Sequence, residues 1–287
     1  GGFVGCEFAH VFSGLGVDVT QVQRSPALLM KEEAEVSQRY TALAGQRYDL
    51  RLATRVVAAH RTDARTWQVH VEGPEGPGVV EAEVVLMAVG RRPNGDRLDV
   101  AAGGIATDEN GLVVVDGQQR TSAQGVWALG DVSSHWQLKH VANHEARVVK
   151  NNLLADWEDT EAMMPANHRF VPSAVFTDPQ IACVGMTENE ARAAGYDIRT
   201  KIQDYGDVAY GWAMEDTTGF AKVIVEAQTG KILGAHIMGH QASSLIQPLI
   251  QAASFGQDAH AVARGQYWIH PALSEVVENA LLGLEFP

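Results

Sequence analysis

A histidine and a glutamate near the end of the chain could form an acid–base pair. His270 precedes Pro271, so we expect its backbone to be extended and to lie outside the helix that follows. Pro271 suits the first position of that helix, where a missing N–H costs nothing. Glu275 then falls in the first turns and can reach back to one imidazole nitrogen, leaving the other to carry a proton. The alternative is a surface histidine beside a glutamate that only stabilises the helix N-terminus. Spacing alone favours the alternative, but the rest of the chain favours the pair.

The first residues fit part of a dinucleotide-binding glycine motif. Gly2 and Gly5 match the second and third glycines of Gly-x-Gly-x-x-Gly. Gly2 would let the backbone approach a pyrophosphate, and Gly5 would let helix and strand pack closely. Near Arg24 the sequence lacks the acid that binds the ribose of NAD, so NADPH is favoured. Half a motif is weak evidence, because any glycine-rich turn can imitate it.

A second candidate binding element is Gly130-Asp131, which follows the apolar run Val126–Leu129. A carboxylate at the carboxyl end of a strand can accept hydrogen bonds from sugar or ribityl hydroxyls, and glycine permits close approach. The alternative is a plain turn, which is favoured when this motif is taken alone.

Composition limits the classes of protein to consider. The chain has 287 residues, 46% hydrophobic and 20% charged, which is typical of a soluble globular protein of roughly two domains. A formal net charge of −13 argues against nucleic acid as a partner. Neither a membrane span nor a signal peptide is visible. Cys6 and Cys183 are isolated, so we expect buried thiols, no metal site and a cytoplasmic protein.

The pattern of elements predicts an α/β Rossmann-like nucleotide-binding domain in residues 1–92, whose first strand is missing. This domain contains a hairpin loop at Gly73–Gly78 and ends in a buried strand at Val84–Val89. Residues 93–160 hold predicted strands near Leu112–Val115 and Val126–Leu129 and a helix from about Leu138 to Leu154. The acidic, aperiodic segment 156–167 is predicted to be a linker.

Residues 168–287 predict a separate α+β domain. Thr187 and Glu190 form a capping box at the start of a helix that Gly195 should end. The predicted strands are Phe170–Phe176, Ile181–Gly185, Ile198–Tyr205, Phe220–Glu226 and Lys231–Met238.

Taken together, these segments resemble the flavoprotein disulfide reductases, the family of glutathione reductase and dihydrolipoamide dehydrogenase. The matches span the whole chain in the order that the family has: the half glycine motif, Gly90–Asn94, Thr121–Asp131, Phe176–Pro179 and His270–Glu275. Three further stretches are similar to one member that reduces the disulfide of a small-molecule thiol, namely Leu138–Asn143, Tyr205–Asp216 and Gly265–His270.

The resemblance implies NADPH and FAD as cofactors. It also implies that residues 93–160 are the C-terminal part of an FAD-binding domain and that residues 168–287 are a dimerisation domain. The helix that begins near Lys139 and His140 would point its positive end at the flavin. His140 replaces a common proline there, and its role stays open between flavin contact and filler. Met30 stands where glutathione-type reductases carry a second phosphate-binding arginine, so Lys31 is a candidate substitute. The implied NADPH ligands are Gly2, Gly5 and Arg24, with Phe3 and Glu7 near the nicotinamide, and the remaining implied cofactor-binding residues are Gly90, Arg91, Gly130, Asp131, Lys139 and His140.

By the same resemblance, electrons would pass from NADPH through FAD to an enzyme disulfide, and a thiolate would then attack the substrate disulfide. His270, supplied by the opposite subunit of a homodimer and oriented by Glu275, would protonate the leaving thiolate. The active site would therefore be shared between subunits.

The chain departs from the family in one large respect. Neither the Cys-x-x-x-x-Cys redox pair nor the N-terminal FAD glycine motif occurs in it. We therefore expect the C-terminal part of a longer reductase, inactive alone. Two alternatives stay open: another family member such as a dihydrolipoamide dehydrogenase, and a non-catalytic nucleotide-binding or dimerisation module.

Overall fold

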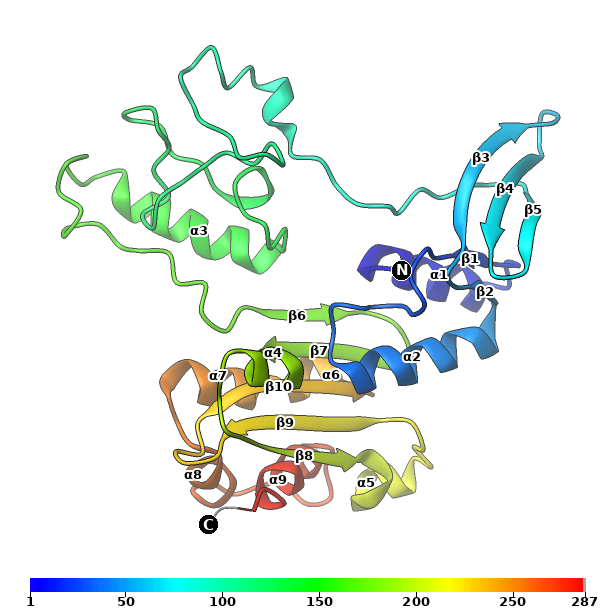
Figure 1. Ribbon diagram of the computed structural model, residues 1–287. Helices are drawn as coiled ribbons and strands as arrows, with labels where there is room; N and C mark the ends of the chain where they lie inside the picture. The colour runs from blue at the N-terminus through cyan, green and yellow to red at the C-terminus, as the bar shows by residue number, and fades with distance from the viewer. Residues whose placement is uncertain (286–287) are drawn as a thin grey trace. The chain divides into compact units, whose positions relative to one another are not determined.

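The computed structural model describes residues 1–285, which form two compact units, of which the larger has mixed α/β structure (Figure 1). The larger unit combines Gly1–Val89 with the residues from Pro172 onward, and the smaller unit is Gly90–Val171. No helix in the described part of the chain is long and apolar enough to cross a membrane. The larger unit begins with α1 (Phe3–Gly14), β1 (Thr20–Val22), α2 (Ala34–Arg47), β2 (Asp49–Arg51), β3 (Arg55–Arg61), β4 (Trp67–Gly73) and β5 (Gly76–Ala82).

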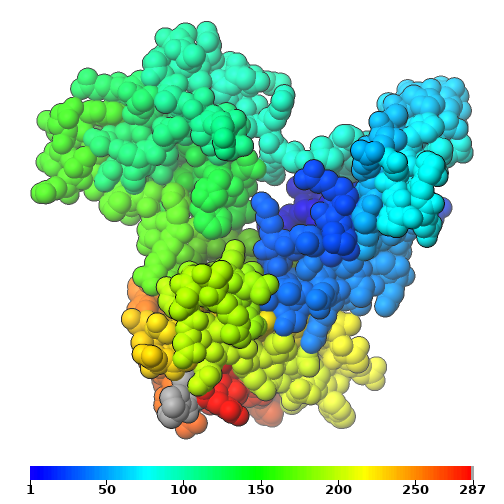
Figure 2. Space-filling view, in the orientation of Figure 1, coloured from blue at the N-terminus to red at the C-terminus, as the bar shows by residue number. Residues whose placement is uncertain are grey.

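The start of the larger unit is a parallel strand–helix–strand crossover. β1 pairs in parallel with β2, and α2 connects them, as parallel strands require. An antiparallel sheet of β3, β4 and β5 follows, and its second hairpin closes where Gly73 faces Gly76. The predicted hairpin loop is thus confirmed and is shorter than expected. β3 is exposed along its whole length, and this sheet lies at the surface of its unit, in cyan in Figure 2.

The predicted buried strand at Val84–Val89 is wrong. These residues form no strand, and Val84, Met87 and Val89 are 80%, 71% and 83% exposed. A strand needs a hydrogen-bonded neighbour, and within residues 1–285 the two-stranded sheet of β1 and β2 does not include this segment.

The second part of the larger unit is built on a five-stranded antiparallel sheet with the order β6-β7-β10-β9-β8. β10 is buried at every position and β9 at all but its last, because helix α7 covers β10 while α9 packs on β8 and β9. The predicted α+β arrangement and its five strands are confirmed. The elements are β6 (Pro172–Val175), β7 (Gln180–Gly185), α4 (Glu188–Ala193), β8 (Ile198–Asp204), η3 (Tyr205–Asp207), α5 (Ala209–Ala213), β9 (Phe220–Glu226), β10 (Ile232–Gly239), α6 (Ala242–Leu245), α7 (Gln247–Phe255), α8 (Ala259–Arg264) and α9 (Ser274–Leu282).

Local sequence signals place α4 as predicted. The Thr187 hydroxyl accepts from the backbone N–H of Glu190, and the Glu190 carboxylate accepts from the backbone N–H of Thr187. Gly195, with φ of 84°, follows the end of the helix, a conformation that glycine adopts without a steric penalty.

One hydrophobic core joins the two parts of the larger unit. Tyr40 of α2 and Cys6 of α1 pack with Phe220, Cys183 and Met238 of the five-stranded sheet. Both cysteines are free and buried, as the sequence predicted. The crossover at the start of the chain is therefore seated directly on the sheet.

The smaller unit has little regular structure apart from one helix. Its elements are η1 (Asn94–Arg97), η2 (Gly130–Val132) and α3 (Lys139–Asn152). The helix agrees with prediction, but the predicted strands near Leu112–Val115 and Val126–Leu129 are wrong, because each contributes only one isolated bridge. The Asp108 and Asp116 carboxylates accept backbone N–H groups two and four residues ahead. These local turns satisfy backbone groups that strands would otherwise pair.

The segment predicted as a linker packs within the smaller unit. The Trp157 ring meets Trp127 edge to face at 4.8 Å, and Met163 is 5% exposed. Asn152, at the end of α3, is fully buried; its side chain donates to the carbonyls of Gln118 and Met164 and accepts from the Met164 N–H. The segment is irregular but is held to the helix.

Candidate active site

His270 and Glu275 are in direct contact at the start of α9. His270 Nδ1 lies 2.7 Å from Glu275 Oε1, and Glu275 Oε2 accepts from the backbone N–H of Ala272 at 3.1 Å. The His270 side chain is 68% exposed and that of Glu275 is 16% exposed. The carboxylate thus holds one ring nitrogen while the imidazole faces solvent.

Pro271 does not occupy the first helical position, so that prediction is wrong. The helix begins at Ser274 with Leu273 as its N-cap residue, and Pro271 follows His270 through a cis peptide bond. Glu275 does lie in the first turn, as predicted.

The pKa of Glu275 is lowered, chiefly by the hydrogen bond from His270; burial opposes this shift, and the hydrogen bond from Ala272 adds to it. A carboxylate can only accept a hydrogen bond, so Nδ1 of His270 carries the proton of this contact. Nε2 is the nitrogen left to exchange a proton with another group. The geometry is that of an oriented proton donor or acceptor.

The N-terminus of α1 has the features of a phosphate site. Gly2 is the N-cap residue and supplies no side-chain cap, and a Cβ there would meet nothing within 4 Å. A Cβ at Gly5 would come within 3.4 Å of the Gln21 side chain and 3.8 Å of Ala88, so helix and neighbouring chain pack closely. The exposed Arg24 follows β1. Open backbone donors at the start of α1 and an arginine after β1 fit the phosphates of a nicotinamide nucleotide.

The structure gives Glu7 a partner of its own. Its Oε1 accepts from the backbone N–H of Phe176 at 2.8 Å, which ties α1 to the Phe176–Pro179 segment. Phe3, in the first turn of α1, packs against the core of the larger unit. The places of Phe3 and Glu7 near a nicotinamide stay predictions.

In the smaller unit, Asp131 is exposed and paired with Arg91. Arg91 Nη1 lies 3.0 Å from Asp131 Oδ2, and the Asp131 side chain is 54% exposed. Gly130, with φ of 72°, brings the turn so close to α3 that a Cβ would lie 3.3 Å from that of Ala142. α3 begins at Lys139, and its N-cap residue Leu138 makes no side-chain cap.

A carboxylate, a guanidinium and a helix N-terminus within one small unit fit a ligand that carries both hydroxyl and carbonyl groups, as FAD does. Gly90, which also belongs to this unit, has a positive φ of 129°. His140 is the second residue of α3. The cofactor-binding roles of all these residues stay predictions.

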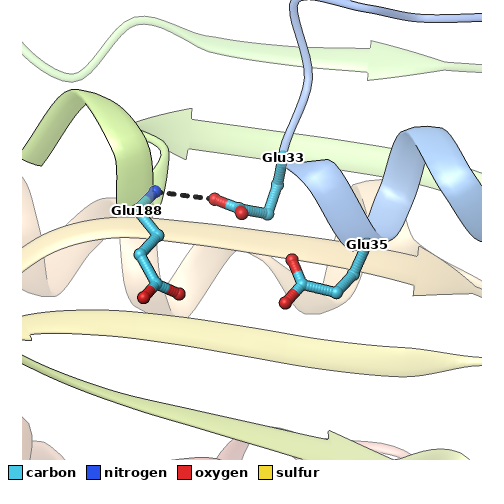
Figure 3. Close-up of side chains that lie close together, drawn as sticks. All are labelled: Glu33, Glu35 and Glu188. Atoms are coloured by element: carbon cyan, nitrogen blue, oxygen red, sulfur yellow. Dashed lines mark hydrogen bonds between the residues drawn. The ribbon is translucent and has the colours of Figure 1, made fainter.

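Sequence reasoning missed a buried ionic cluster around Lys222. Its Nζ lies 3.0 Å from Glu33 Oε1 and 2.8 Å from carboxylate oxygens of Glu35 and Glu188. Figure 3 shows the three carboxylates, which come from the starts of α2 and α4. They lie close enough to hold a cation, and the ammonium of Lys222, 2% exposed, is the cation among them. The available signal was a lysine inside the apolar strand β9.

Glu145 was also missed. It is 1% exposed on α3, where it accepts from the backbone N–H of Gly130 at 2.6 Å and contacts His168 Nε2 at 2.8 Å. The signal was an acid on the apolar face of a helix, since the buried positions of α3 are Val141, Glu145, Val148, Val149 and Asn152.

The chain belongs to the pyridine nucleotide-disulphide oxidoreductase family. Residues 1–146 match that family, and residues 171–281 match its dimerisation domain. The resemblance and the fold class drawn from the sequence motifs are thereby confirmed.

Mycothione reductase of Mycobacterium tuberculosis is 59% identical to this chain over 283 residues, covering 99% of the chain and 61% of that protein. Dihydrolipoyl dehydrogenase of Corynebacterium glutamicum is 31% identical over 288 residues, covering 99% of the chain and 60% of that protein. Among solved structures, the HOCl-induced flavoprotein disulfide reductase RclA of Escherichia coli matches with a TM-score of 0.85 at 27% identity, covering 98% of this chain and 62% of that one. The chain thus spans about three fifths of the length of these relatives.

Proposed function

We propose that this chain serves an NADPH-dependent FAD disulfide reductase that converts mycothione, the disulfide of mycothiol, to mycothiol. In this proposal residues 1–92 bind NADPH, residues 93–160 belong to the FAD-binding domain, and residues 168–287 form the homodimer. The observation that carries the proposal is the 59% identity to mycothione reductase over 99% of the chain. The lower identity of 31% to a dihydrolipoyl dehydrogenase favours the mycothione reductase assignment over that alternative.

The residues divide between nucleotide binding and proton transfer. Gly2, Gly5 and Arg24 hold the phosphates of NADPH through backbone N–H groups and a guanidinium. Asp131 accepts hydrogen bonds from the ribityl hydroxyls of FAD. Bound FAD supplies the route by which an electron pair from NADPH reaches a disulfide.

His270 acts on the substrate thiol. Glu275 fixes Nδ1–H, so Nε2 points its proton toward the leaving thiolate, which departs more readily as a neutral thiol. The exposure of His270 is consistent with a site completed by a second subunit. The redox cysteine pair of such a reaction is not supplied by Cys6 and Cys183, which are free and buried in separate elements.

The test is a turnover assay on the full-length protein with FAD. The proposal requires NADPH oxidation that depends on mycothione and is slower with NADH. NAD-dependent oxidation of dihydrolipoamide, with no turnover of mycothione, would instead assign a dihydrolipoyl dehydrogenase. Nucleotide binding without flavin or turnover would assign a non-catalytic module and overturn the proposal.

A further inference from the structure

Glu145 carries a buried carboxylate whose two oxygens hold different parts of the smaller unit. Oε2 accepts from the backbone N–H of Gly130 at 2.6 Å, and Oε1 contacts His168 Nε2 at 2.8 Å. Burying a carboxylate at 1% exposure is unfavourable unless both oxygens are hydrogen-bonded. The contact with Gly130 is therefore a strong constraint on the backbone at that point, since hydrogen bonds to charged groups are the stronger ones.

The turn at Gly130 is constrained from several sides. Its carbonyl accepts from the N–H groups of Ser133 and Ser134 at 3.0 and 2.8 Å, so both backbone polar groups of Gly130 are engaged. Its Cα lies against Ala142 of α3, with no room for a larger side chain without displacement. These contacts leave the next residue, Asp131, pointing outward beside Arg91.

Glu145 also links this turn to α3, the helix that begins at Lys139. It lies on the same helix as Lys139, about one and two-thirds turns further along. A hydrogen bond from Gly130 to Glu145 therefore sets the distance between the Asp131 carboxylate and the helix N-terminus. These are the two groups that would meet different parts of one flavin cofactor.

We propose that Glu145 is a positioning residue that fixes the Gly130–Asp131 turn against α3 and so presets Asp131 and the N-terminus of α3 for FAD. The inference rests on the proposed function in that FAD is the ligand. Glu145 itself lies behind the turn, is inaccessible to solvent and acts through Gly130.

The experiment compares four forms of the full-length protein, stripped of flavin and titrated with FAD by flavin fluorescence. Glu145→Ala should raise the dissociation constant for FAD about tenfold or more. Glu145→Gln keeps an oxygen that can accept from Gly130, so it should stay within about threefold of wild type. Asn152→Ala removes a buried polar side chain at the other end of α3, and it should lower the melting temperature without a comparable loss of FAD affinity.

A second measurement distinguishes a loss of the fixed position of Gly130 from a general loss of stability. Amide hydrogen exchange at Gly130 in the flavin-free protein should be faster in Glu145→Ala than in wild type, and near wild type in Glu145→Gln. Equal FAD affinity in wild type and Glu145→Ala would overturn the inference, as would equal losses in Glu145→Ala and Asn152→Ala. A wild-type protein that binds no FAD would overturn the proposed function together with this inference, and is recognised by the wild-type titration alone.

Discussion

Glu33 accepts a hydrogen bond from the backbone N–H of Glu188, a residue 155 positions further along the chain. The same carboxylate caps its own helix through the N–H of Ala34 and contacts Lys222 Nζ. One side chain therefore joins the starts of α2 and α4 and a central strand of the five-stranded sheet. Burial alone would raise the pKa of Glu33, but the hydrogen bonds from Glu188 and Lys222 outweigh it and leave that pKa lowered.

Lys222→Met should destabilise the larger unit strongly. The substitution leaves Glu33, Glu35 and Glu188 without their shared cation, and breaking a buried ion pair from one side costs about 3–5 kcal/mol. The free energy of unfolding in urea measures the effect. Lys231→Met, at an exposed position beside β10, is the matched control and should change it by less than about 0.5 kcal/mol. Similar losses in the two variants would contradict a role for the cluster.

The cluster also predicts a dependence of stability on pH. Hydrogen bonds from Lys222 and Arg192 lower the pKa of Glu188 below 4.5, and the pKa of Glu33 is lowered as well. A lowered pKa contributes stability that is present above the unfolded value and is lost as pH falls through the folded value. The free energy of unfolding should therefore fall between about pH 5 and about pH 3.

The pKa of Lys222 is shifted in the opposite direction, upward. Burial lowers its pKa, but hydrogen bonds to Glu188, Glu35 and Glu33 outweigh burial and raise it above 10.5. Its contribution is complete below pH 10.5 and is lost only as pH rises through the folded value. In Lys222→Met the acid-side loss should shrink or reverse; an unchanged pH profile in the variant would count against this assignment.

His270→Gln should separate the two halves of the proposed reaction in the full-length protein. Disulfide turnover should fall by about 100-fold or more, since a general acid contributes at least that much. Flavin reduction by NADPH, followed by stopped-flow absorbance, should be nearly unchanged. His260→Gln, on the exposed face of α8, is the control. Equal loss in both half-reactions would refute the proton-transfer role.

Arg24→Glu should weaken NADPH selectively. The guanidinium is expected to pair with the 2′-phosphate that NADH lacks, so the Michaelis constant for NADPH should rise about tenfold or more while that for NADH changes little. Arg65→Glu, exposed between β3 and β4, tests for a general effect of charge. An unchanged ratio of the two Michaelis constants would exclude Arg24 as the residue that binds the 2′-phosphate.

Local signals in the sequence predicted the dimerisation domain well. The capping box at Thr187 and the apolar strands Phe220–Glu226 and Ile232–Gly239 could be predicted from the residues of each element alone. The apolar runs at 84–89, 112–115 and 126–129 were wrongly predicted to be strands, because a strand exists only where another strand pairs with it. Local turns at Asp108 and Asp116 also compete for the backbone of the smaller unit.

The site could be predicted in part. The His270–Glu275 contact follows from spacing and is present, whereas the helix begins at Ser274 and not at Pro271 as predicted. Lys222 and Glu145 have partners 189 and 15 residues away, respectively. A single sequence indicates only that a charge interrupts an apolar face, and the partner emerges from the tertiary structure.

The burial of the two thiols, Cys6 and Cys183, affects their reactivity toward disulfides. Burial raises the pKa of Cys6 to about 11, and it raises that of Cys183 well above its usual value. Only a thiolate attacks a disulfide, so the raised pKa values keep both thiols in the protonated, unreactive form at neutral pH. In the folded chain, Cys6 and Cys183 therefore do not undergo thiol–disulfide exchange with the proposed disulfide substrate.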